Sequence, residues 1–178
     1  MTKWIIDADH SVARFSVRHF MIANVVGLFN KITGFVQFDP PDVGHLSVEA
    51  EVDVGSLTTG LTARDEHLLS PDYFDAGKYP KMVFKGKDVE PKGKNGGRLK
   101  GDFTLRGITR PITLEFEYFG PVKSPFSGKQ CIGFGASTRI NREDYGMSWN
   151  EMMPEGAGVV MSREVSIHID VEADLATD

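Results

Sequence analysis

The chain has 178 residues, of which 20 are basic and 25 are acidic, and its formal net charge is -5. An acidic chain without a long run of Lys or Arg is poorly suited to follow a phosphate backbone, so nucleic acid is excluded as a partner. Its one cysteine, Cys131, rules out an internal disulfide and a Cys-rich zinc site, and we expect a buried strand thiol. The length suits a single domain over residues 1–178.

The sequence begins MTKWIIDADH, which lacks the apolar stretch of a secretory signal. Nowhere do about 18 apolar residues run together, as a membrane-spanning helix requires. We therefore expect a cytoplasmic protein without stable membrane insertion. If the natural protein carries a leader that is cleaved, the expected compartment is periplasmic or extracellular instead.

Apolar and polar residues alternate over most of the chain, which is the period of a half-buried strand. Gly, Pro and Asn clusters separate these segments, as in antiparallel sheets with short turns. No strand–helix–strand alternation is present, so a parallel sheet is not expected. The pattern predicts about nine strands, over residues 4–7, 13–19, 28–39, 45–54, 81–89, 98–105, 112–119, 130–140 and 163–172.

Strands with one apolar face form either a sandwich or a barrel, and their period does not distinguish the two. Gly34, Gly86 and Gly101 fall on the predicted inward faces, where glycine permits the bends of a curled sheet. We therefore predict an all-β antiparallel barrel of eight or slightly more strands. Because these glycines remove side-chain volume from the interior, an internal cavity is expected.

The stretch TARDEHLLSPDYFD, residues 62–75, interrupts the strand pattern and predicts a short helical insertion. Thr62 is the expected N-cap, with Asp65 as its capping-box partner, and Ser70 and Pro71 are expected to end the helix. The apolar side chains of this segment should cover one end of the barrel: Leu61, Leu68, Leu69 and Phe74.

The same stretch contains a cluster of charged residues that resembles a catalytic or metal site. The positions three and four residues from His67 hold no metal ligand, so no metal site is predicted. Glu66 and His67 are neighbours that point about 100 degrees apart on a helix, so they do not act on one atom. We interpret the charges as a solvated or ion-paired helix face.

The other histidines are scattered and do not have metal-ligand spacing. His19 shares the inward phase of Ala13, Phe15 and Val17, so it is either a structural histidine or a hydrogen-bond donor to a ligand head group. The segment 141–162 carries large apolar side chains that cover a barrel mouth, join a dimer interface or close the core: Met147, Trp149, Met152 and Met153.

Five segments together resemble the YceI-like family of lipid-binding, lipocalin-like barrels. They are DADHSVARFSVRH, VVGLFNKITGFVQFD, TTGLTARDEHLLSPDYFDAGKYP, LKGDFTLRGITRPITLE and GFGASTRINREDYGM. The resemblance implies an elongated barrel with a helix at one end and a lumen that holds a polyisoprenoid, a prenyl quinone or another long amphiphile. It also implies a homodimer, no catalytic residues, no cofactor besides the bound lipid and an architectural role for RDEHL.

On this basis we expect non-catalytic lipid binding as a carrier, store or sensor. His19 is the expected contact to the head group. Two alternatives stay open: an enzyme that acts on a lipid through His19 with a carboxylate or serine, and a dimeric interaction module with a filled interior. The expected lining residues are Phe15, Val17, Phe84, Phe103, Leu105, Leu114 and Phe134 from strands, with Leu68, Phe74 and Trp149 at the ends.

Overall fold

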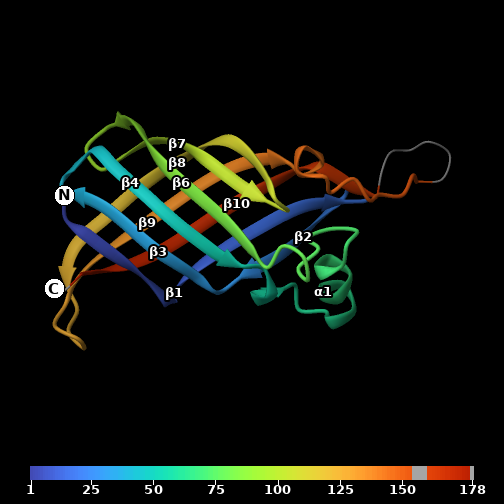
Figure 1. The fold of residues 1–178 in the computed structure, drawn as a ribbon, viewed down its shortest axis with the longest axis horizontal. Helices are drawn as coiled ribbons and strands as arrows, with labels where there is room; N and C mark the ends of the chain where they lie inside the picture. The colour runs from blue at the N-terminus through green and yellow to red at the C-terminus, as the bar shows by residue number, and fades with distance from the viewer. Residues whose placement is uncertain (154–159, 177–178) are drawn as a thin grey trace.

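The computed structural model describes residues 1–153 and 160–176, and these residues fold around one antiparallel sheet that closes on itself. Eight strands form an elongated barrel, and two further strands extend it beside the first (Figure 1). Both chain termini lie at one end of the barrel, and the helix lies at the other end (Figure 1). The predicted all-β barrel with a helical insertion is confirmed.

The strands follow one another with short turns, and the helix stands between the fifth and sixth. Two single-turn 3-10 helices, η1 (Val54–Ser56) and η2 (Arg142–Tyr145), follow β4 and β9. The helix is α1 (Thr62–Leu69). The strands are β1 (Lys3–His19), β2 (Ala23–Phe29), β3 (Ile32–Asp39), β4 (Asp42–Asp53), β5 (Leu57–Thr58), β6 (Lys81–Lys92), β7 (Gly96–Leu105), β8 (Ile108–Lys123), β9 (Gln130–Asn141) and β10 (Met161–Leu175).

The long strand β1 closes the barrel. Its whole length pairs with β10, its first residues pair with β3, and its second half pairs with β2. A bulge between Asp7 and Val12 separates the two halves. The prediction of separate strands over 4–7 and 13–19 is therefore wrong, because the bulge breaks the alternation without ending the pairing. The predicted strand 28–39 is in turn divided between β2 and β3.

Two clusters of buried apolar side chains fill the two halves of the barrel. One contains Trp4, Phe38 and Leu46 near the termini, and the other contains Phe29 and Tyr145 toward α1. Phe103 and Ile169 pack against both clusters, so they lie at the middle of the barrel interior: one residue from β7 and one from β10. The interior is thus apolar along its length.

The glycines that favoured a barrel do lie close to neighbouring strands, but they do not create empty space. A Cβ on Gly34, whose φ is +138°, would lie 2.1 Å from the Glu49 carbonyl oxygen of β4. A Cβ on Gly86 would lie 2.8 Å from Cε1 of Phe84, so the Phe84 ring occupies the volume that glycine leaves. The expected cavity is present, but these glycines are not its source, because they permit close packing of strand and ring.

Helix α1 is held to the preceding segment by its charged residues. Asp65 accepts hydrogen bonds from the backbone N–H and the hydroxyl of Thr59, at 2.8 and 2.5 Å, and Arg64 donates to the same residue. The N-cap is Leu61 without a side-chain hydrogen bond, so the predicted Thr62 capping box is wrong, because Asp65 is used by Thr59. Leu61 is 55% exposed and, contrary to expectation, does not cover the barrel.

Candidate ligand-binding cavity

The barrel contains an internal cavity of about 440 Å³. Inward-facing side chains of barrel strands line it, and α1, the turn after it and the segment after η2 complete the lining. A volume of this size is typical of sites that enclose a small molecule. Most of the lining is aliphatic or aromatic, so transfer of an apolar chain from water into this cavity is favourable.

The cavity ends below an aromatic layer near the chain termini. Trp4, Phe38 and Tyr118 are nearly fully buried, and their rings pack with centroid distances of 6.4 Å for Trp4–Phe38 and 5.4 Å for Phe38–Tyr118. The Trp4 indole N–H donates to the Phe38 carbonyl at 3.3 Å, which orients the ring. None of these three side chains is part of the cavity lining, so they separate it from the terminal end.

A second aromatic group surrounds the cavity at the α1 end. His67 from α1, Tyr73 from the following turn and Trp149 from the segment after η2 lie with ring centroids 4.8 to 5.5 Å apart. All three line the cavity. Met147 is buried in the neighbouring core cluster, whereas Met152 is 71% exposed. Of the uses considered for this segment, Met147 and Trp149 close the barrel end; residues 154–159 lie outside the described residues.

Every residue predicted from the sequence to line the lumen lies on the cavity wall. His19 lies at the α1 end, where its ring packs on Phe20 with centroids 3.9 Å apart. Whether these side chains contact a ligand stays a prediction. The lining includes Phe15, Val17, His19, Leu68, Phe74, Phe84, Phe103, Leu105, Leu114, Phe134 and Trp149.

Sequence reasoning missed Arg142, the buried charge of this cavity. Arg142 is only 3% exposed and lines the cavity at the α1 end. Its Nε donates to the Ser162 carbonyl at 2.9 Å, and its Nη1 donates to the carbonyls of Met147 and Trp149 at 2.5 and 2.9 Å. Nη2 is buried without a hydrogen-bond partner among the described residues. No local pattern distinguishes this Arg from an exposed one, because its carbonyl partners belong to irregular backbone and to β10, 5 to 20 residues further along the chain.

Burial also changes the acidity of the groups around this arginine. Burial lowers the pKa of Arg142, although a guanidinium remains charged at any physiological pH. Burial raises the pKa of Tyr73 to about 12, so its phenol is neutral beside the guanidinium. The Tyr73 hydroxyl donates to Sδ of Met161 at 3.8 Å. The α1 end therefore places the buried guanidinium of Arg142 beside the neutral phenol of Tyr73.

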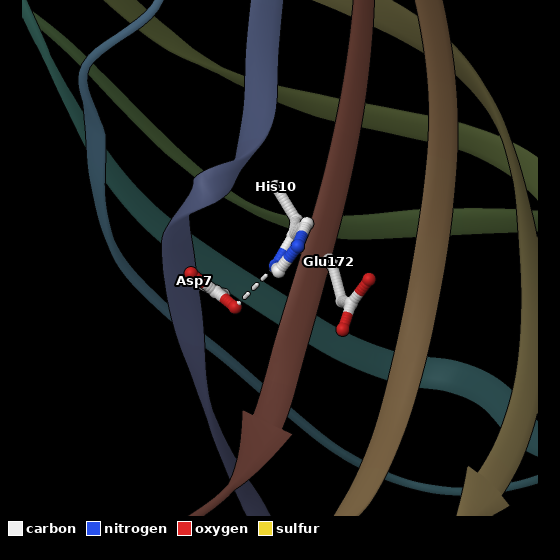
Figure 2. Close-up of side chains that lie close together, drawn as sticks. All are labelled: Asp7, His10 and Glu172. Atoms are coloured by element: carbon white, nitrogen blue, oxygen red, sulfur yellow. Dashed lines mark hydrogen bonds and ion pairs between the residues drawn. The ribbon is translucent and has the colours of Figure 1, made fainter. Parts of the chain in front are cut away.

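Outside the cavity, the bulge of β1 brings Asp7 and His10 beside Glu172 of β10, an arrangement drawn in Figure 2. Nδ1 of His10 and Oδ2 of Asp7 are 2.7 Å apart. The hydrogen bond that His10 donates to the Asp7 carboxylate raises the pKa of His10, and the same bond lowers the pKa of Asp7. This triplet could offer ligands to a cation, but its His and Asp already satisfy each other, so the ion pair explains the geometry.

Cys131 is the buried strand thiol expected from the sequence. Its Sγ donates to Oδ1 of Asp174 at 3.0 Å. This hydrogen bond and burial raise the pKa of Cys131 to about 11. Cys131, Glu172 and Asp174 lie close enough together to offer three ligand atoms to a metal ion. A thiol held in its protonated form is, however, a poor metal ligand.

The fold and the cavity define this chain as a small closed β-barrel with an enclosed apolar interior. In the described part of the chain, no helix has the length and apolar character needed to cross a membrane. The model of the YceI-like domain matches residues 4–173, and the chain belongs to this family.

Known proteins of similar sequence or structure agree with this assignment. UPF0312 protein SA2479 of Staphylococcus aureus is 32% identical over 176 residues, which is 99% of each chain. The crystal structure of BcnA from Burkholderia cenocepacia superposes with a TM-score of 0.80 over 97% of this chain and 99% of that one, at 22% identity. A polyisoprenoid binding domain from Saccharophagus degradans superposes with a TM-score of 0.68 over 99% and 100% of the two chains, at 14% identity. These two structures share the fold.

Proposed function

We propose that this protein binds a long-chain amphiphile, a polyisoprenoid or prenyl quinone, in the barrel cavity and leaves it chemically unchanged. The observation that carries the proposal is the apolar cavity of about 440 Å³ inside the barrel, which extends from the aromatic layer to α1. Membership of the YceI-like family, and the fold shared with a domain that binds polyisoprenoids, support it.

The energetics favour a long chain over a short one. Burial of each methylene contributes about 0.8 kcal/mol, whereas association costs roughly 4 to 15 kcal/mol in lost freedom. By this arithmetic, about 5 to 19 methylenes are needed before binding becomes favourable. A protein that takes its ligand from a membrane must also compete with the bilayer, so slender tails of many carbons are the best substrates for transfer.

The part of the chain that the structure describes contains no pairing of His19 with a carboxylate or a serine, which the enzyme alternative requires. Among the described residues, the side chain of His19 has no hydrogen bond to a carboxylate or a serine, and no Asp or Glu lines the cavity. Incubation of the protein with a prenyl lipid, followed by extraction and mass spectrometry, separates the two functions. Unchanged lipid supports a carrier, and a product of altered mass supports an enzyme.

Organic extraction of purified protein followed by mass spectrometry tests binding directly. We expect about one long-chain lipid per chain. An empty extract, combined with no uptake of an added prenyl quinone, would contradict the proposal and favour an interaction module.

Substitution of Phe103 by Trp tests the location of the ligand. Phe103 contacts both core clusters, so a larger ring at this position obstructs the middle of the cavity. We expect Phe103→Trp to reduce the uptake of a fluorescent prenyl lipid about tenfold or more while the far-ultraviolet circular dichroism of the barrel is retained. Asp102→Trp, one residue away on the exposed face of β7, is the matched control and should bind normally. Equal uptake by both variants would place the ligand elsewhere.

A further inference from the structure

The permanently charged side chains that line the cavity are all arginines: Arg14, Arg64 and Arg142. Among residues 1–153 and 160–176, no Asp or Glu lines the cavity. This is unexpected in a chain whose net charge is -5. Arg14 is paired with Asp170 on the outer surface, so the groups that matter lie at the α1 end.

Arg142 differs from the other two because it is buried and forms no ion pair within the described part of the chain. Its donors reach only neutral carbonyls, and no carboxylate lies within ion-pair distance of it among residues 1–153 and 160–176. The adjacent Glu143 is instead paired with Arg163, with Nε and Oε1 3.2 Å apart. A buried charge without a partner costs several kcal/mol unless something else stabilises it.

The three carbonyl contacts also explain how Arg142 is fixed. They hold the guanidinium in one orientation at the end of β9 and attach it to the segment that carries Trp149. Three of its N–H groups are thereby used, and both hydrogens of Nη2 are left over. The three carbonyls therefore fix the orientation of the guanidinium without using all of its donors. Among the described residues, both Nη2 hydrogens and the positive charge stay unpaired beside an apolar cavity.

From this arrangement we infer that the cavity selects ligands with an anionic head group, a carboxylate or a phosphate, and that Arg142 is the residue that determines this specificity. The inference rests on the proposed function and narrows it: the apolar tail lies along the barrel, and the anion lies at the α1 end near Tyr73. Arg64, whose Nε donates to the Thr59 hydroxyl at 2.7 Å, adds a second positive charge to the same end.

The interaction does not need an open donor. Nη2 is buried, so direct hydrogen bonding to a ligand oxygen requires neighbouring groups to move. The electrostatic attraction acts without that movement, because a charge in a low-dielectric interior is screened far less than one in water. A neutral quinone or alcohol receives only a small part of this stabilisation.

The test compares ligands with one tail and three head groups: hexadecanoic acid, hexadecyl phosphate and hexadecanol. Binding is measured by competition against a fluorescent lipid, below the concentration at which any of them aggregates. A hydrogen bond or ion pair to a buried charge corresponds to roughly tenfold or more in affinity. We expect wild-type protein to bind one or both anions at least about tenfold more tightly than the alcohol; a preference between the two identifies which lipid class supplies the head group.

Variants assign the preference to Arg142. Arg142→Met should lose the preference for anions and retain the affinity for hexadecanol, and Arg142→Lys should keep part of the preference. Arg139→Met is the matched control, because Arg139 lies three residues before Arg142, near the end of β9, with its side chain exposed and paired with Glu164. It should behave as the wild type does.

Failure of this inference differs from failure of the proposed function. Equal affinity of wild-type protein for all three ligands overturns the anion inference and leaves lipid binding intact, whereas no binding of any of them overturns lipid binding itself. An unchanged anion preference in folded Arg142→Met overturns the assignment to this residue. If Arg142→Met does not fold, a reduced anion preference in Arg142→Lys still tests the assignment to Arg142. The wild-type comparison of the three ligands still tests the anion preference itself.

Discussion

Single residues in this barrel acquire their properties from partners that are distant in sequence or placed by irregular backbone. Asp7 and His10 meet because the bulge of β1 turns both side chains to the same surface (Figure 2). The ion pair raises the pKa of His10 above its ordinary value of 6.5 and lowers that of Asp7 below 3.8. The pair therefore stabilises the fold fully above pH 3.8 and below pH 6.5.

The pH dependence of this pair can be measured directly. Its contribution to stability is lost as pH rises through the raised pKa of His10, and also as pH falls through the lowered pKa of Asp7. We expect the NMR titration of the His10 ring to have a midpoint above 6.5 and to shift downward in Asp7→Asn. Asp9→Asn, in the same bulge, should shift it much less, since Asp9 is the weakest contributor. Equal midpoints in Asp7→Asn and wild type would contradict the ion pair.

At the scale of elements, the close contact between β3 and β4 restricts which residue can occupy position 34. Gly34 has a φ of +138°, and a Cβ there would lie 2.1 Å from the Glu49 carbonyl oxygen. Both the backbone conformation and the space therefore require glycine. In contrast, a Cβ on Gly135 of β9 would meet nothing closer than 3.9 Å.

These two glycines provide a matched pair of substitutions. Gly34→Ala should lower the free energy of unfolding by about 2 to 4 kcal/mol, because it adds backbone strain and a steric clash. Gly135→Ala should change it by less than about 1 kcal/mol. Denaturant titration followed by tryptophan fluorescence measures both. A similar small effect in both variants would mean that β3 and β4 adjust easily, contrary to the packing described above.

The short α1 depends on tertiary contacts more than on its own sequence. It has no side-chain N-cap and only eight residues, which is below the length at which isolated helices are stable in water. Asp65 and Arg64 bind Thr59, and Leu68 and Leu69 pack on the core cluster of this end. The charged residues of RDEHL thus position the helix over the cavity, as the family resemblance implies.

At the scale of the whole molecule, an internal cavity lowers stability until it is filled. The lining loses packing contacts that a ligand chain would restore. At a free ligand concentration 100 times the dissociation constant, binding to the native state alone adds about 2.7 kcal/mol to the free energy of unfolding. We expect this increase when delipidated protein is loaded with a prenyl lipid.

Thermal or denaturant unfolding of delipidated and loaded protein measures the effect. Phe103→Trp should gain less on loading than the wild type, since its cavity is obstructed. An equal gain in both would indicate lipid adsorption at the surface. The homodimer implied by the resemblance stays a prediction, for which light scattering on loaded and delipidated samples gives the mass of the particle.

The sequence by itself determined the class of fold and part of the wall of the cavity. Alternation with period two places one side of each strand inward, so Phe15, Phe103 and Leu114 could be assigned to the interior from their positions alone. The helical insertion and the buried Cys131 followed from equally local patterns. Each of these properties depends on residues a few positions apart.

Only the tertiary structure decided where the charges lie and what the glycines do. Arg142 is buried because β9, η2 and the carbonyls of Met147 and Ser162 converge on it. Asp65 turns away from the helix terminus because Thr59 is within reach, and Phe84 fills the volume above Gly86. None of these contacts follows from the period-two alternation, because that period gives only the face of the strand on which a side chain lies.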